Sequence, residues 1–370
     1  MIARARKATG PVRVLVVDDS PFMRKAIGRM LSAVPGIEVV ALAASGREAV
    51  ECLERLAPDV VTLDVVMPGM DGVQTLEHIM RVHPVPVIMV SSLTRENAEV
   101  TLSALEAGAV DFVEKPSGMP NMNMPTIAGD LARKILAVAS VDLGRIAEAR
   151  HSEPALTPQS ASPAPTPSLA EQPAAQPAAD IVVIGCSTGG PPALQRLLTA
   201  LPSDFPVPVV VVQHMPEGFT AALAERLDRN CQLEVREVRD QDLVRPGRIL
   251  IAKSGRQLHF ARRGERVVTR LDLTPSDTPH TPSIDVAMNS AAEVYGSRTL
   301  ATLLTGMGAD GARGMVAVRG AGGMTLAEAE SSAVIFGMPK VAAELGGVEE
   351  MLDLSQIASR IVARSLGQAR

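Results

Sequence analysis

One segment of the chain, residues 151–179, cannot belong to a packed core and therefore divides the protein in two. It reads HSEPALTPQSASPAPTPSLAEQPAAQPAA and holds almost no large apolar side chain. Its recurring prolines lack the backbone donor that a helix needs, and so little apolar surface cannot offset the entropy of ordering the chain. We therefore expect a semi-rigid, extended linker between two folded parts.

The length of 370 residues agrees with two domains, because a domain averages about 150 residues. We place a first domain at residues 11–135, a helix end and the Pro/Ala-rich linker at residues 136–179, and a second domain at residues 180–370. Hydrophobic residues make up 46% of the chain, which is enough for two buried cores.

Composition narrows the classes of partner. The net charge of -5 argues against a dominant nucleic-acid-binding role, and an aromatic content of 2% argues against base stacking. Three scattered cysteines are too few for a disulfide framework and are typical of a reducing compartment. Because neither a signal peptide nor a run of about 18 apolar residues is found, we expect a cytoplasmic protein with no nucleic-acid partner and no membrane insertion.

Short apolar runs, many of them rich in Val, alternate with amphipathic stretches in both halves. The runs are residues 12–17, 37–43, 60–63, 87–90 and 110–113, then 181–185, 207–213, 248–252 and 299–304. Apolar runs without alternation are typical of parallel strands that helices cover on both faces. We therefore predict an α/β protein with two doubly wound parallel-sheet domains, whose sites lie beyond the carboxyl ends of the strands.

Charged residues follow three of the runs in the first half: Asp18 and Asp19, then Asp64, then Lys115. Carboxylates that crowd together repel one another, and Mg²⁺ would resolve this conflict because it prefers carboxylate, water and phosphate oxygens. Asp64 is then a candidate nucleophile for a phosphoryl group, which Lys115 would neutralise and the Ser91 hydroxyl would bind. Taken singly, Asp18 or Asp19 also fits a helix N-cap and Lys115 a solvated charge.

The motifs DDS, LDVVMPGMDG, MVSSLT and AGAVDFVEKP closely resemble the receiver domain of bacterial response regulators over residues 12–117. The resemblance implies a flavodoxin-like fold, with Phe112 at the aromatic switch position. It also implies that Asp64 is the phosphoacceptor. Asp18, Asp19 and Asp64 would be the Mg²⁺ ligands, and Ser91 and Lys115 would contact the phosphate.

The second half offers a candidate nucleophile. Gly185-Cys186-Ser187-Thr188-Gly189-Gly190 satisfies G-x-S-x-G, a sharp strand-to-helix turn that exposes a serine. The helix start adds amide donors and a positive dipole end. Because the motif also fits a phosphate loop or a plain N-cap, it needs a partner base. His214 ends the strand after the one that carries Ser187, and Asp310 follows a third strand and would orient the imidazole.

A dinucleotide-binding interpretation competes with this triad. Residues 306–311 match G-x-G-x-x-G after a strand, and Glu328 near the end of the run 323–327 would bind a ribose. The alternative function is therefore a receiver-controlled binding module with a dinucleotide-binding output domain. It leaves Ser187 and His214 unexplained, whereas the triad explains all three loops.

The motifs IGCSTGGPPAL, VVVQHMPEGFT, LLTGMGADGARGM and FGMPK resemble the protein-glutamate methylesterase domain of the chemotaxis CheB family. The resemblance implies a Rossmann-like fold, the triad Ser187, His214 and Asp310, and oxyanion donors near Thr188 and Met307. No cofactor is implied at the esterase site. Cys186 is expected to be a packed small residue.

The same resemblance implies a phosphorylation-activated methylesterase that also acts as a glutamine amidase. Methyl-accepting chemoreceptors would be its substrates, and a histidine kinase of the CheA type its phosphodonor. The chain departs from the family pattern at Thr281, where the family usually has Arg before Pro-Ser, and at Ala327-Glu328, where it favours Gln-Asp-Glu. We further expect the receiver to cover the mouth of the esterase until it is phosphorylated.

Overall fold

The computed structural model of the chain describes residues 10–92, 94–115, 124–139, 141, 178–272 and 278–367. Most of the predicted linker, residues 151–177, lies outside these ranges. Its last two residues pack on the second domain, since the Ala178 amide donates to the Ser365 carbonyl oxygen at 2.7 Å and Ala179 is fully buried. Within the described ranges, no helix is long and apolar enough to cross a membrane.

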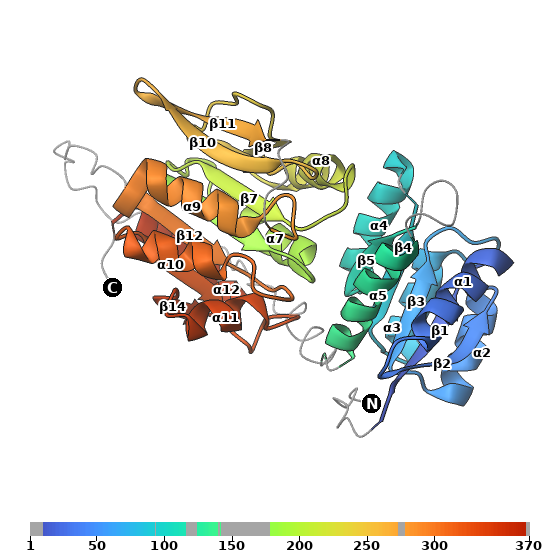
Figure 1. The fold of residues 1–370 in the computed structure, drawn as a ribbon. Coiled ribbons are helices and arrows are strands. Elements are labelled where there is room, and N and C mark those ends of the chain that lie inside the picture. Colours follow the sequence, from blue (N-terminus) through green and yellow to red (C-terminus); the bar gives the residue numbers. More distant parts are fainter. Residues whose placement is uncertain are drawn as a thin grey trace, which may run out of the picture.

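The first domain alternates strands and helices around one parallel sheet (Figure 1). Its elements are β1 (Val12–Val17), α1 (Pro21–Ser32), β2 (Ile37–Ala43), α2 (Gly46–Leu56), β3 (Val60–Asp64), α3 (Gly72–Val82), β4 (Val87–Ser91), α4 (Arg95–Ala107), β5 (Asp111–Glu114) and α5 (Met124–Val138). The sheet order is β2-β1-β3-β4-β5. Each predicted strand is present within one or two residues of its expected bounds.

Local sequence explains where these helices begin. Ser20, Ser45, Asp71 and Thr94 each accept a hydrogen bond from the amide three residues further along. Such N-caps satisfy amide groups that the helix itself leaves unpaired. Because Ser20 caps α1, neither Asp18 nor Asp19 is needed as the cap, and the structural interpretation of these two carboxylates is wrong.

The second domain has the same architecture with a longer sheet. Its elements are β6 (Ile181–Cys186), α7 (Gly190–Thr199), β7 (Val209–Gln213), α8 (Phe219–Asn230), β8 (Glu234–Glu237), β9 (Arg248–Ile251), β10 (Gln257–Arg263), β11 (Arg266–Asp272), α9 (Ile284–Tyr295), β12 (Thr299–Leu303), α10 (Ala312–Gly320), β13 (Met324–Glu328), α11 (Met338–Glu344), β14 (Glu350–Leu352) and α12 (Leu354–Ser365). The parallel sheet runs β14-β13-β12-β6-β7-β9-β8, and β10 and β11 form a separate antiparallel hairpin. The two edge strands are not among the predicted runs, because β8 reads EVRE and β14 has only three residues.

In both sheets the strand order reverses its direction at the position where a site is expected. In the first domain β1 lies between β2 and β3, and in the second β6 lies between β12 and β7. At such switch points the connections leave to opposite faces and open a crevice beyond the carboxyl ends of the strands. The crevice of the first domain therefore opens beside Asp18 and Asp64, and that of the second beside Ser187.

The two domains pack against each other through α4 of the first and α7 and α8 of the second (Figure 1), and β5 contributes Phe112. At the centre, the rings of Phe112 and Phe219 lie with their centroids 4.5 Å apart. At the rim, the Arg226 guanidinium donates to the Glu106 carboxylate at 2.7 Å and to the Ser103 hydroxyl at 3.1 Å. An apolar centre with a charged rim is typical of a specific protein interface.

Candidate functional site

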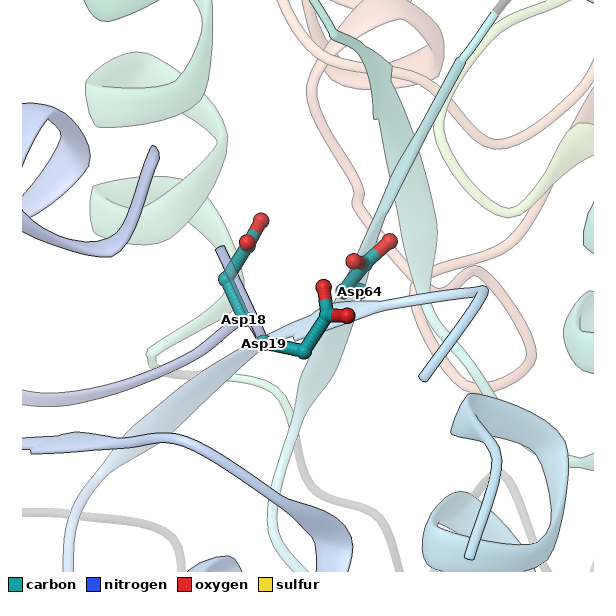
Figure 2. Close-up of side chains that lie close together, drawn as sticks. All are labelled: Asp18, Asp19 and Asp64. Atoms are coloured by element: carbon teal, nitrogen blue, oxygen red, sulfur yellow. The ribbon is translucent and has the colours of Figure 1, made fainter. Parts of the chain in front are cut away.

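Three carboxylates meet at the crevice of the first domain (Figure 2). Asp18 and Asp19 follow β1, and Asp64 ends the neighbouring β3, so the sheet itself brings them together. One oxygen of each lies within 4.8 Å of the others. Asp18 and Asp64 are buried, whereas Asp19 is exposed. This arrangement agrees with the predicted acidic cluster and suits a hard divalent cation.

Lys115 lies between two of these carboxylates. Its Nζ is 2.6 Å from Asp64 Oδ2 and 2.9 Å from Asp18 Oδ2, which rules out a merely solvated lysine. Burial raises the pKa of Asp64 to about 6, although the ammonium of Lys115 opposes this shift. The cluster therefore holds more negative charge than one lysine balances, and an added cation would relieve it.

The other predicted receiver residues lie at the same end of the sheet. Ser91 is buried at the end of β4, where its hydroxyl accepts a hydrogen bond from the Thr101 hydroxyl at 2.8 Å. The Lys115 amide donates to the Ser91 carbonyl oxygen at 2.6 Å. Phe112 is buried on β5 and contacts Phe219 of the second domain. A change at Ser91 thus lies one strand away from the domain interface.

Ser187 lies on a tight turn between β6 and α7. Its amide donates to the Thr305 carbonyl oxygen at 3.0 Å, which ties the turn to the loop after β12. A side chain at Gly306 would place its Cβ only 2.9 Å from the Ser187 Cβ, so the close approach of the two loops requires glycine there. From β7, the Gln213 side-chain amide donates to the carbonyl oxygens of Ser187 and His214, both at 2.9 Å.

His214 and Asp310 are directly hydrogen-bonded, with 2.7 Å between His214 Nε2 and Asp310 Oδ2. A carboxylate only accepts, so Nε2 carries the hydrogen and the neutral ring keeps Nδ1 free to take up a proton. Nδ1 is buried and forms no hydrogen bond with the part of the chain that the structure describes. The imidazole is therefore oriented by Asp310 and still has a vacant basic nitrogen.

The Asp310 carboxylate is stabilised from several sides. It accepts hydrogen bonds from the Ile284 amide at 2.7 Å, the Ser283 hydroxyl at 2.8 Å and the Asp285 amide at 3.1 Å. Burial alone would raise the pKa of Asp310, but His214, the Ile284 amide and the Ser283 hydroxyl hold it well below its usual range. Because three of the donors lie at the start of α9, that helix terminus supports the negative charge.

Ser187, His214, Thr188 and Met307 line one cleft, and the first domain forms its opposite wall. From that domain the lining residues are Val113, Glu114, Asp130, Arg133 and Lys134. Thr188, beside Ser187, donates its hydroxyl hydrogen to the Asp111 carboxylate at 2.5 Å. The turn that carries Ser187 is thus in direct contact with the receiver-like domain.

Glu328 is not placed to bind a ribose. It is 1% exposed, and its two oxygens accept hydrogen bonds from the Thr305 amide at 2.8 Å and the Ser332 hydroxyl at 3.0 Å. Its carboxylate supports the loop after β12 and is not available to bind a ribose, so the dinucleotide interpretation lacks the acidic residue that it requires. Of the two departures from the family pattern, Thr281 lines the cleft and Glu328 does not.

Cys186 is a packed residue, as expected. It is fully buried, its thiol donates to Gln213 Oε1 at 3.0 Å, and burial raises the pKa of the thiol well above its usual value. Such a thiol is inert as a nucleophile at neutral pH. Sequence reasoning missed the contacts of Gln213, Asp111 and His280 around this site. Only the position of Gln213, directly before His214 at a strand end, offered a signal.

Fold and site together define a two-domain α/β protein in which a receiver-type acidic cluster accompanies a cleft lined by Ser187 and by a His214 that is hydrogen-bonded to Asp310. Comparison with protein-family models gives the same division: residues 14–125 match the response regulator receiver domain, and residues 182–361 match the CheB methylesterase domain.

Full-length relatives extend the match over nearly the whole chain. A protein-glutamate methylesterase/protein-glutamine glutaminase from Geobacter sulfurreducens is 45% identical, over 95% of this chain and 97% of its own. One from Geobacillus kaustophilus is 43% identical, over 95% of this chain and 98% of its own. The chain therefore belongs to the CheB family of receiver-regulated protein-glutamate methylesterases/protein-glutamine glutaminases.

Solved structures resemble each domain separately. The CheB methylesterase catalytic domain of Thermotoga maritima is 41% identical, with a TM-score of 0.49, and the match covers 50% of this chain and 97% of that one. The response regulator domain of Thermotoga maritima CheB is 45% identical, with a TM-score of 0.34, and the match covers 36% of this chain and 98% of that one.

Proposed function

We propose that this protein hydrolyses methylated glutamate side chains of chemoreceptors to glutamate and methanol, deamidates glutamine by the same route, and is activated by phosphorylation of its receiver domain. The observation that carries the proposal is the meeting of three strand ends at one cleft. There Ser187 follows β6, His214 follows β7 and is hydrogen-bonded to Asp310 in the loop after β12.

In the first half-reaction, the Ser187 hydroxyl oxygen attacks the ester carbonyl carbon while His214 Nδ1 takes the hydroxyl proton. The imidazolium returns this proton to the leaving methoxy group, so methanol departs and an acyl-serine remains. Asp310 stays ionised and stabilises the imidazolium. Backbone donors near Thr188 and Met307 stabilise the negative oxygen of the tetrahedral intermediate.

In the second half-reaction, water attacks the acyl-serine and gives up a proton to His214. Collapse of the second tetrahedral intermediate releases the glutamate carboxyl group, and the proton returns to the Ser187 oxygen. For a glutamine side chain, ammonia leaves in place of methanol in the first half-reaction. The same residues therefore serve both activities.

In the receiver domain, we assign Asp64 as the phosphoacceptor and a CheA-type histidine kinase as the phosphodonor. Asp18, Asp19 and Asp64 would hold Mg²⁺, and their three oxygens within 4.8 Å suit it. When bound, the ion neutralises charge on the transferring phosphoryl group. Lys115 and Ser91 contact the phosphoryl oxygens.

Regulation follows from the shared cleft. Receiver residues such as Glu114 and Arg133 form one wall of it, so a protein substrate would have to share the cleft beside Ser187 with the receiver while the domains are closed. Phosphorylation that draws Ser91 inward would disturb β5 and the contact between Phe112 and Phe219. Moving the ratio of closed to open molecules from about 10:1 to about 1:10 takes only about 2.7 kcal/mol.

The test is methanol release from radiolabelled methylated receptor, with and without a small-molecule phosphodonor. We expect phosphodonor to raise the rate, and we expect the fragment 180–370 to be more active than the unphosphorylated full-length chain. Absence of methanol release would reject the esterase assignment. A folded fragment that is no more active would instead reject covering as the means of control.

A further inference from the structure

A second imidazole lies flat on the imidazole of His214. The ring centroids of His214 and His280 are 4.0 Å apart, and the ring planes are inclined by only 12°. Both rings line the cleft that also contains Ser187. The proposed triad uses only His214, so this contact has no role in it.

The loop that carries His280 is fixed to the site by its backbone. The His280 carbonyl oxygen accepts hydrogen bonds from the Gln257 side-chain amide at 2.8 Å and from the Thr278 hydroxyl at 3.0 Å. Gln257 is buried, and its Oε1 accepts a bond from the Ser283 amide at 2.8 Å. Because the Ser283 hydroxyl in turn donates to Asp310, the loop and the carboxylate form one connected unit.

The His280 ring is neutral under ordinary conditions. Burial, together with the positive charge of a protonated His214, lowers the pKa of His280 to about 4. The other charged groups that face it are Asp310 and, on α5 of the receiver, Arg133 and Asp130. A neutral aromatic face attracts a cation placed above it, so the stacked His280 ring can interact favourably with the positive charge that His214 carries during the reaction.

We propose that His280 is a positioning residue of the esterase, which fixes the plane of the His214 ring and supports the charge that this ring takes from Ser187. The covalent bond to Cβ and one hydrogen bond to Asp310 hold the imidazole at two points, and the ring can still tilt about the line that joins them. The stacked ring prevents this tilt and keeps Nδ1 in one position. The inference rests on the proposed function of Ser187 and His214.

The test compares two substitutions in the full-length chain, assayed with saturating phosphodonor on methylated receptor. His280→Phe keeps a flat neutral ring, whereas His280→Leu fills the space without one. We expect His280→Leu to lower kcat by about tenfold or more while KM stays within about twofold. We expect His280→Phe to keep kcat within about threefold of the unmodified protein.

Two controls separate the possible failures. His259→Leu, at a histidine on the hairpin strand β10, should leave kcat unchanged. Ser187→Ala should abolish turnover, and if it does not, the proposed function fails rather than the inference. The positioning role is overturned if kcat of His280→Leu is unchanged, or if only KM rises while kcat stays the same. If His280→Leu fails to fold, a folded His280→Phe protein whose kcat falls tenfold overturns it as well.

Discussion

The Thr188 hydroxyl donates a 2.5 Å hydrogen bond to Asp111, so the residue beside Ser187 is held by a side chain of the receiver domain. Asp111 is buried and also lies 3.1 Å from the Lys134 Nζ. A hydrogen bond to an ionised group typically contributes about 1.5–3 kcal/mol. The receiver domain therefore forms one wall of the cleft and also holds the turn that carries Ser187.

Removal of this contact should loosen the closed state. We predict that Asp111→Ala raises the basal activity of the unphosphorylated full-length chain. If the closed form is favoured by about 10:1 and the substitution costs about 1.4 kcal/mol, the open fraction rises about fivefold. Methanol release without phosphodonor measures this fraction.

The matched control for Asp111→Ala is Glu38→Ala. Glu38 is an exposed acidic residue on β2, at the edge of the receiver sheet opposite to β5. The basal rate of methanol release by the Glu38→Ala variant should equal that of the unmodified protein. A folded Asp111→Ala protein with an unchanged basal rate would show that the grip on Thr188 contributes nothing to inhibition.

Ser187→Ala should lower turnover by several powers of ten, because no acyl-enzyme can then form. Ser187 is partly exposed, and it is the backbone amide and carbonyl of Ser187 that form the hydrogen bonds that hold it in its turn. The melting temperature should therefore change little. Steady-state methanol release and thermal unfolding measure the two quantities separately. A loss of only a few fold in a well-folded variant would contradict the nucleophile assignment.

Asp310→Asn should be about as severe as removal of the base. The asparagine amide would donate toward Nε2 of His214, which favours the tautomer with its hydrogen on Nδ1, and the basic nitrogen is then lost for Ser187. We expect kcat to fall by about 10⁴-fold while KM changes little. Activity within tenfold of the unmodified protein would show that His214 does not need this partner.

The sequence predicts where in the fold the residues that follow apolar strands lie. Asp18, Asp64, Ser187, His214 and Asp310 each come directly after or soon after such a run, and parallel strands place these ends at one edge of a sheet. Their neighbourhood is thus encoded locally. The Pro/Ala-rich segment 151–179 indicates the division into two domains, and it lies between the two family-model matches at residues 14–125 and 182–361.

Contacts between distant segments leave no such signal. Thr188 and Asp111 are 77 residues apart and belong to different domains, and neither lies in a pattern that names its partner. The stack of His280 on His214 depends on how a loop folds back over the sheet. The charged edge strand β8 was also hidden, because an edge strand faces solvent and loses the apolar pattern of its neighbours.

Asp64→Asn should abolish the response to phosphodonor and preserve the basal activity. An amide cannot accept the phosphoryl group, and it removes one of the three carboxylates of the acidic cluster. The Ser187, His214 and Asp310 side chains belong to the other domain and are untouched. Activity with and without phosphodonor measures the response, and chelation of divalent cations by EDTA should abolish it in the unmodified protein. A variant that still responds would place the phosphoacceptor elsewhere.

Glu328 is buried and supports the loop after β12. Burial raises the pKa of Glu328 from 4.5 to about 7 in the folded protein. Between these values the folded chain holds a proton that the unfolded chain releases, so the free energy of unfolding falls as pH rises through this window. Glu328→Gln has no titrating group at this position. Its free energy of unfolding should therefore fall less over the same pH range, by up to about 3 kcal/mol. Denaturant unfolding of both proteins at pH 5 and pH 8 measures the difference, with exposed Glu330→Gln as the control. Equal pH dependence in the unmodified protein and in Glu328→Gln would mean that Glu328 is already ionised at pH 5 in the folded state.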